Sequence, residues 1–129
     1  MSPEPPNEVI QLHPKVVRRV IDKVTIPAAG SFLSSTVDLA DVYMLAISMR
    51  CKYSDQASDP LTAYVYTSTD DINWDTEELV SFSSIVDAGE IVQKTVYIDP
   101  DAQEIRVKVT NEDAAESVTE VVVEATLTF

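Results

Sequence analysis

The sequence predicts an all-β fold, an antiparallel β-sandwich or jelly roll of about eight strands with an extended N-terminal arm. Two stretches in the last third of the chain alternate apolar and polar residues, as a strand with one buried face does. Turn-forming residues recur roughly every 8–12 residues, a spacing typical of sandwiches and barrels. The alternating apolar positions are Ile105, Val107 and Val109 in the first stretch, and Val121, Val123, Ala125, Leu127 and Phe129 in the second.

The chain is expected to divide into an extended arm, residues 1–15, and one sandwich domain, residues 16–129. Four of the seven prolines fall in the arm. Because proline has no backbone N–H group, they interrupt regular strand pairing there. The arm is either a frayed terminus or a tether that docks on a neighbouring subunit. In the second case, the partner-binding residues are Ile10, Leu12 and Pro14.

The first segment of the domain is ambiguous between helix and strand. Residues 16–26 contain valines at helical spacing, but β-branched side chains dominate, and these favour strands. We therefore predict a strand over Arg19–Ile26, with Val20, Val24 and Ile26 on one face.

Each remaining strand is expected between two turn-forming stretches. The strand over Tyr43–Cys51 has small or apolar residues on both faces, which indicates a central position in its sheet. The other predicted strands cover Ser31–Leu39, Leu61–Ser68, Leu79–Ile85, Ile91–Ile98, Glu104–Thr110 and Thr119–Phe129. The turns between them lie at Pro27–Gly30, Ala40–Asp41, Ser54–Pro60, Thr69–Trp74, Asp87–Glu90, Pro100–Asp101 and Asn111–Ser117.

The charge balance excludes two classes of partner. Nine basic residues against 22 acidic ones give a formal net charge of −13. A chain this acidic has no basic stripe for a phosphate backbone, so we expect no nucleic-acid partner. The same charge opposes binding to an anionic membrane surface, and no apolar run approaches the roughly 20 residues of a membrane-spanning helix. Residues 1–8 lack the basic start and apolar stretch of a signal peptide.

The sequence offers no catalytic motif, and we expect no enzyme, cofactor or metal. Cys51 is the only cysteine and alternates with apolar neighbours, which indicates a buried side chain; the only histidine, His13, lies in the arm. Pairs of aspartates lie in predicted turns, where their carboxylates bond the local backbone. A bound cation is the alternative reading of these pairs, but none matches the twelve-residue calcium loop. The aspartate pairs are Asp55 with Asp59, Asp70 with Asp71, and Asp99 with Asp101.

Aromatic residues offer one candidate ligand site. Trp74, Tyr64 and Tyr66, together with Tyr97, are the residues from which a stacking platform for a sugar would be built, as in carbohydrate-binding modules. The alternative is that Trp74 packs over a sheet edge and the tyrosines fill the second face of their strands.

Two stretches resemble small β-sandwich domains of virion proteins from tailed phages and archaeal tailed viruses. Residues 26–47 (IPAAGSFLSSTVDLADVYMLAI) resemble the opening of these domains, and residues 63–75 (AYVYTSTDDINWD) resemble a strand that runs into their Ser-x-Asp-Gly-x-x-Trp turn. Asp71 departs from the pattern, because it takes the place of the glycine that would tolerate a positive φ. The resemblance covers roughly residues 20–129.

The resemblance implies a non-enzymatic structural protein of the virion, used for capsid decoration or as a neck or tail accessory. Its implied partners are further copies of the chain and other virion proteins, such as major capsid or tail proteins. The alternative function is a carbohydrate- or receptor-binding β-sandwich module.

Overall fold

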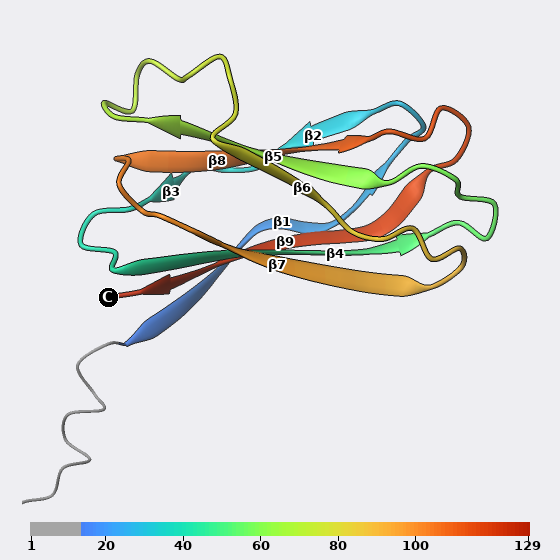
Figure 1. The fold of residues 1–129 in the computed structure, drawn as a ribbon, viewed down its shortest axis with the longest axis horizontal. Helices are drawn as coiled ribbons and strands as arrows, with labels where there is room; N and C mark the ends of the chain where they lie inside the picture. Colours follow the sequence, from blue (N-terminus) through green and yellow to red (C-terminus); the bar gives the residue numbers. More distant parts are fainter. Residues whose placement is uncertain (1–13) are drawn as a thin grey trace, which may run out of the picture.

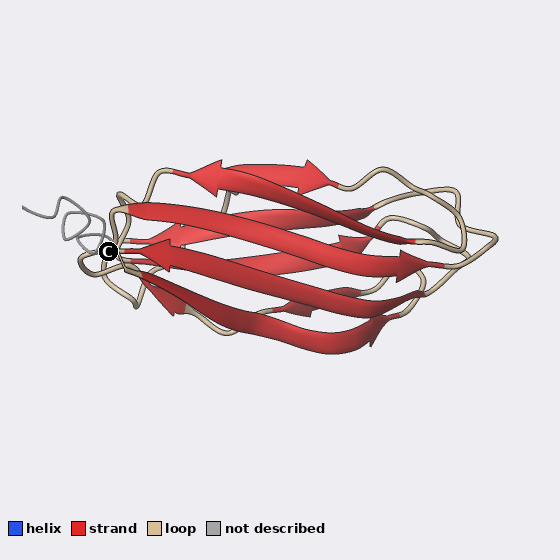
Figure 2. Ribbon diagram, turned by 90° about the horizontal axis from the view of Figure 1, so that it is seen from below, coloured by secondary structure: helices blue, strands red, loops and turns tan. Residues whose placement is uncertain are grey.

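The fold is all-β, as the alternation predicts. The structure is a computed structural model that describes residues 14–129, in which nine strands and no helices are present. Figures 1 and 2 show two layers of strands joined by loops at both ends. The strands are β1 Lys15–Ile26, β2 Ser31–Leu33, β3 Val37–Asp38, β4 Met44–Tyr53, β5 Leu61–Ser68, β6 Val80–Ser83, β7 Ile91–Ile98, β8 Glu104–Asn111 and β9 Val118–Thr128. The described residues include no helix able to cross a membrane.

The strand order is that of a jelly roll. One sheet, here called sheet A, has the order β1-β9-β4-β7, and the other, sheet B, has the order β2-β8-β5-β6, with β3 also paired to β8. Since β2 and β3 share one partner, they count as two pieces of one strand. The first strand then pairs with the last, the second with the second to last, and so on inward, as when a long hairpin is wrapped into two sheets.

The core fills the space between the two sheets. Inward-facing residues of β4, β5, β8 and β9 are almost fully shielded from solvent, which is what the alternation requires. Cys51 is among them, so its predicted burial is confirmed, and burial raises the pKa of its thiol. Strand β4 lies between β9 and β7, which confirms its predicted central position.

Several strand limits agree with the sequence prediction, and one predicted strand is broken. Strands β5 and β7 have the predicted limits. The strand expected over Ser31–Leu39 divides into β2 and β3. At the break, the hydroxyl of Ser34 takes the place of a backbone carbonyl as the hydrogen-bond acceptor toward β8. This hydroxyl accepts a hydrogen bond from the Val107 N–H at 2.8 Å, while the Ser34 N–H donates to the Val107 carbonyl.

Strand β1 departs from the prediction in length and in phase. It begins at Lys15, four residues before the predicted start, and its pairing with β9 is interrupted by register shifts. Val20 and Val24 pack partly buried against the core and Ile26 is buried, as predicted, but Ile21 is buried as well, so the strict alternation fails. The shifts rotate the strand, and Lys23 takes a positive φ of 49° within them.

Strand β9 also breaks its alternation near its start. Val122, which the sequence places on the wet face with Glu120, is buried but lies outside the core cluster. Glu120 has a positive φ of 52°, and the pairing with β4 shifts between Arg50 and Lys52. A bulge at this point changes which side chains face the core, a feature that a strict period of two cannot anticipate.

Candidate functional site

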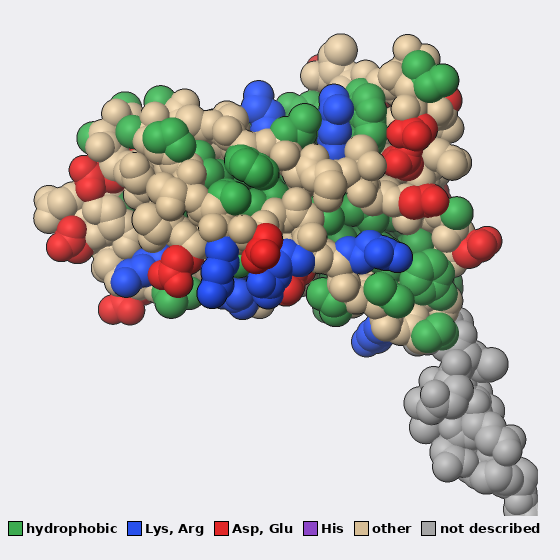
Figure 3. All heavy atoms as spheres, turned by 180° about the vertical axis from the view of Figure 1, so that it is seen from behind, with side chains coloured by type: hydrophobic (Ala, Val, Ile, Leu, Met, Phe, Trp, Pro, Cys, Tyr) green, Lys and Arg blue, Asp and Glu red, His purple; other side chains and the backbone are tan. Residues whose placement is uncertain are grey.

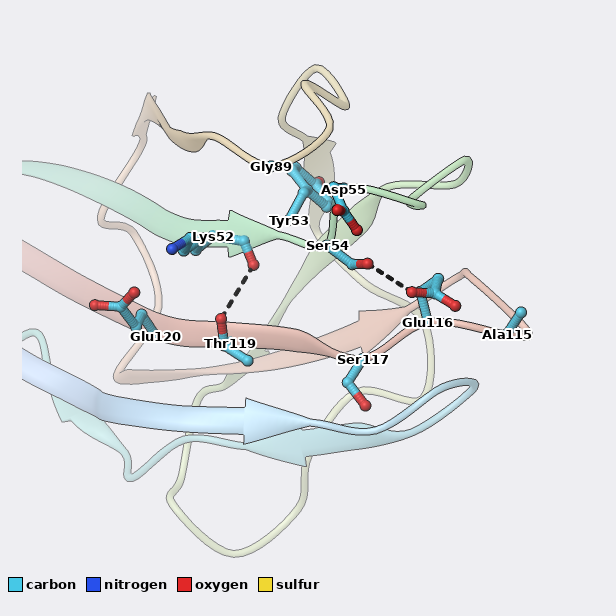
Figure 4. A pocket seen from close by; sticks show the side chains of 10 residues that line it. All are labelled: Lys52, Tyr53, Ser54, Asp55, Gly89, Ala115, Glu116, Ser117, Thr119 and Glu120. Carbon is cyan, nitrogen blue, oxygen red and sulfur yellow. Dashed lines mark hydrogen bonds between the residues drawn. The ribbon is translucent and has the colours of Figure 1, made fainter.

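The largest pocket lies at the end of the sandwich where β4 meets the start of β9. Figure 4 shows its lining, which is mostly polar and includes the carboxylates of Asp55, Glu116 and Glu120. Its volume is about 660 Å³. The Ser54 hydroxyl donates a hydrogen bond of 2.5 Å to Glu116. Within residues 14–129, no group of three or more Asp, Glu, His or Cys side chains is arranged to hold a metal ion.

One predicted aspartate pair shows the turn chemistry expected of it. The Asp70 carboxylate accepts hydrogen bonds from the N–H groups of Ile72 and Asn73 at 2.9 and 2.8 Å. These bonds hold the pKa of Asp70 well below its usual range. Asp71 has a φ of 64°, so it adopts the left-handed conformation that glycine would favour at this position.

The predicted partner-binding residues fall mostly outside the described part of the chain. Ile10 and Leu12, like His13, belong to residues 1–13, which the structure does not describe. Pro14 is exposed, and its carbonyl accepts a 3.0 Å hydrogen bond from the N–H of Phe129. Pro14 and the carboxyl end of the chain therefore meet at one end of the sandwich, where Figure 1 marks the C-terminus.

The predicted aromatic platform is divided between the two sheets. Tyr64 and Tyr66 lie half-buried on the outer face of β5 in sheet B, and Trp74 lies in the loop that follows β5. The Arg106 guanidinium lies 4.3 Å from the centre of the Trp74 ring, so a cation covers one face of the indole. Tyr97 lies on β7 of sheet A and does not join the others.

Sheet B carries a groove on its outer face beside this platform. The groove has a volume of about 420 Å³, and Tyr66, Phe32 and Leu33 supply its apolar surface. Arg106 and Lys108 of β8 add positive charge. An apolar surface with a few charged groups suits a small ligand or a peptide.

Sheet A carries a second outer groove, which the sequence analysis missed. Tyr43, Met44, Ala46, Thr95, Tyr97 and Lys15 line it, and its volume is about 420 Å³. Tyr43, Met44 and Tyr97 are 61%, 47% and 76% exposed. The adjacent apolar pair Tyr43-Met44 could have indicated this groove. It was overlooked because Met44, on the outward face of β4, was interpreted only as a sign that the strand is central.

Apolar and basic side chains also gather on the β1 side of the molecule. Figure 3 shows hydrophobic side chains at the end where the described chain begins, and lysine and arginine side chains along the border formed by sheet A. Val16 and Val17 contribute exposed apolar surface there. Arg19 forms ion pairs with Glu124 at 3.1 Å and Asp22 at 3.0 Å.

Both edge strands of sheet A carry a cation on their inward-facing side. On β1, Arg18 is opposite the buried Ala125. On β7, Lys94 is opposite the buried Met49, so its side chain also starts on the inner face, although its end reaches solvent. Inward cations on edge strands oppose the addition of another strand, because the added strand would bury the charge. Sheet A is thus protected against edge-to-edge extension.

Comparison with known proteins identifies the fold but no family. No protein-family model matches the chain, and no curated protein sequence is similar to it. The class that the fold defines is the double-sheet jelly roll, and solved structures share it. The PBSX exported protein XepA superposes with a TM-score of 0.55 at 17% identity, over 87% of this chain and 36% of that chain.

Virus particles supply further structural matches. A structure of infectious bursal disease virus, Gt strain, matches with a TM-score of 0.58 and 10% identity over 91% of this chain and 32% of that chain. The T13 IBDV viral particle matches with a TM-score of 0.55 and 8% identity over 88% of this chain and 31% of that chain. This chain spans about a third of the length of each of these three chains.

Proposed function

We propose that this chain is a non-enzymatic structural protein of a virion, such as a capsid decoration protein or a neck or tail accessory protein. It binds further copies of itself and other particle proteins, among them major capsid or tail proteins. The jelly-roll fold supports this proposal, because viral particles and the PBSX exported protein XepA contain domains of the same fold. The resemblance of residues 26–47 and 63–75 to virion sandwich domains points to the same function.

The observation that carries the proposal is the exposed apolar surface at the end where the arm joins the domain. Tyr43, Met44 and Val17 are exposed around this end, and apolar side chains gathered on one part of a surface are typical of protein interaction sites. The inward cations of β1 and β7 disfavour contacts made by extending sheet A. Assembly then depends on loops, outer faces and the arm, and modest contacts repeated by symmetry give high avidity.

Deletion of residues 1–14 tests the proposal. We expect the shortened chain to keep its β-sheet circular dichroism spectrum but to enter particles at least about tenfold less than the full chain, because a tethered contact is lost. The measurement is the amount of tagged protein that sediments with purified particles. If the shortened chain enters particles as well as the full chain, the arm has no part in assembly.

A double substitution in the full chain narrows this test to the two apolar residues of the arm. Ile10→Ser with Leu12→Ser should reduce incorporation, whereas the neighbouring change Gln11→Ser should leave it intact. Equal incorporation of both variants would contradict the assignment of Ile10 and Leu12 as partner-binding residues. Failure of the full chain itself to sediment with any particle would contradict the virion function.

The second candidate function is a carbohydrate- or receptor-binding module, and the groove of sheet B favours it. Tyr66 and Phe32 offer aromatic surface there, and Arg106, which also lines the groove, lies over the Trp74 ring. Because Trp74 is the only tryptophan, its fluorescence reports directly on this region. Quenching by an added sugar, lost in Tyr66→Ser, would support the module, and an unchanged spectrum across a glycan panel would count against it.

A further inference from the structure

The outer groove of sheet A has the composition of a site for a proline-rich segment. Two tyrosines, Tyr43 and Tyr97, line it together with Met44; the tyrosines are largely exposed and Met44 is about half exposed. Proline-rich segments adopt the extended polyproline II conformation and bind grooves lined by aromatic rings, because the ordering cost is low and the proline rings pack on the aromatic faces. The groove volume of about 420 Å³ suits a short stretch of such a chain.

The chain itself contains a segment of this kind. Residues 1–13 begin Met-Ser-Pro-Glu-Pro-Pro, and they join the described chain directly before Pro14. Lys15 lines the groove, so the arm departs from the rim of the site. The occupant is therefore available at high local concentration wherever copies of this chain gather.

Charge favours the same pairing. The proline-rich segment carries Glu4 and Glu8. The outer face of sheet A presents Lys15 at the groove and Arg50 further along β4, in a chain of net charge −13. Most of the surface of an acidic protein repels an acidic segment. The repulsion is weakest at the face that carries lysine and arginine side chains.

The length of the arm favours a neighbouring copy over the same chain as the source of the segment. Pro6 lies nine residues before Lys15, and nine residues reach at most roughly 30 Å at ~3.3 Å per residue. A chain of this length reaches the groove of an adjacent copy, whereas the residues next to the groove of the same chain are those directly before Lys15, of which only Pro14 is a proline.

Resting on the proposed function, we infer that the sheet A groove receives the proline-rich arm of a neighbouring copy. The prolines of residues 3–6 pack against Tyr43 and Tyr97, and Glu4 or Glu8 approaches Lys15. Each copy both gives an arm and receives one, so the contact repeats around a ring or along a row of subunits.

Crosslinking of full-length chains tests the contact. One preparation carries Asn7→Cys and another carries Thr95→Cys, which lies in the groove; the control preparation carries Lys108→Cys on the exposed outer face of sheet B. The natural Cys51 is fully buried and does not react. With a short bismaleimide, we expect crosslinked dimers from the first two preparations mixed, at least about tenfold more than with the Lys108→Cys control.

Other crosslinking results would overturn the inference. Equal yields at positions 95 and 108 would show no preference for the groove. Crosslinks confined to a single chain that carries both Asn7→Cys and Thr95→Cys would assign the groove to its own arm. If the chain forms oligomers or enters particles but position 95 never crosslinks, the groove assignment fails while the proposed function stands. A chain that stays monomeric and sediments with no particle contradicts the proposed function itself.

A substitution in the groove gives an independent measurement. Tyr97→Ser removes an aromatic ring that is 76% exposed, so the fold should be kept. We expect at least about tenfold weaker self-association by sedimentation equilibrium, since aromatic anchors dominate interface energies. The matched control is Ile85→Ser, which removes an 84% exposed side chain in the loop after β6. Equal weakening by both variants, or none by Tyr97→Ser, would overturn the inference.

Discussion

Two buried carboxyl groups flank strand β8, and their surroundings are opposite. Asp113, two residues beyond its end, is 2% exposed and accepts hydrogen bonds from the N–H groups of Ser58, Ala115 and Glu116 at 2.9 to 3.0 Å. Glu104, the first residue of β8, is 8% exposed, and one of its carboxyl oxygens has no hydrogen-bond partner. The other end of the carboxyl faces Asp71, a second acid. A buried carboxyl group thus stabilises the chain at one end of β8 and destabilises it at the other.

The two groups respond to pH with opposite signs. Hydrogen bonds from backbone N–H groups, led by that of Ser58, hold the pKa of Asp113 well below its usual range. Its contribution to stability is present above the pKa of an unfolded aspartate, about 3.9, and is lost as the pH falls. The hydrogen bond with Asp71, together with burial, raises the pKa of Glu104. Its protonated form favours the fold, so its contribution is lost as the pH rises through the folded pKa.

The largest effect is expected from Asp113→Ala. The change leaves N–H groups of two loops, residues 54–60 and 112–117, without their shared acceptor, which is costly when the groups are partly buried. We expect the melting temperature at pH 7 to fall by roughly 5–10 °C. Asp70→Ala is the matched control, since its bonds stay within one exposed loop. Equal losses from both variants would show that the link between two loops adds nothing.

A pH series separates the charge of Asp113 from its shape. Asp113→Asn keeps the size of the side chain but loses the ionisation. We expect the difference in unfolding free energy between the natural chain and this variant to be largest at neutral pH and to decrease below about pH 4. Urea unfolding at several pH values measures it. A difference that stays constant down to low pH would exclude the charge as the cause.

A smaller effect of opposite sign is expected from Glu104→Gln. The amide removes a buried charge that faces Asp71 and keeps the shape, so we expect the melting temperature at pH 7 to rise by roughly 3–5 °C. The gain should disappear in acid, where Glu104 is protonated. A loss of stability at neutral pH would mean that the hydrogen bond of Glu104 with Thr36 outweighs the effects of Asp71 and burial.

The smallest effect is expected from Asp71→Gly. Asp71 has a φ of 64°, a conformation that glycine adopts without strain, and the change also removes the acid that faces Glu104. Part of the gain is offset by the greater freedom of glycine in the unfolded chain, which leaves about 0.5 kcal/mol. Chemical denaturation measures this. In the background of Glu104→Gln the gain should be smaller, and full additivity would contradict the contact between the two acids.

The strands that could be predicted have an alternation that follows from one buried face of the sheet, and clear turns bound them. Leu61–Ser68 and Ile91–Ile98 are of this kind, and their limits are correct. The break at Ser34 could not be predicted, because it depends on a hydrogen bond to Val107 on another strand. The register shifts in β1 likewise depend on its pairing with β9, which no local pattern records.

The candidate sites were harder to predict than the fold, since a surface depends on which distant residues meet. The sequence analysis assigned aspartates to turns but could not tell that Asp113 reaches the N–H of Ser58, 55 residues away. Tyr97 was grouped with Trp74, although the strand order places the two on different sheets. Tyr43 and Met44 were interpreted through their own strand alone, so the groove they share with β7 was missed.

The pairing of the first strand with the last limits when sheet A can form during synthesis of the chain. Arg19 bonds Glu124, 105 residues later, so sheet A cannot close until β9 has been synthesised. Topologies dominated by such distant pairings fold in roughly milliseconds to seconds, far slower than helical bundles. During that interval β4 lacks its neighbour β9, and the excess of acidic over basic residues opposes association between unfinished chains.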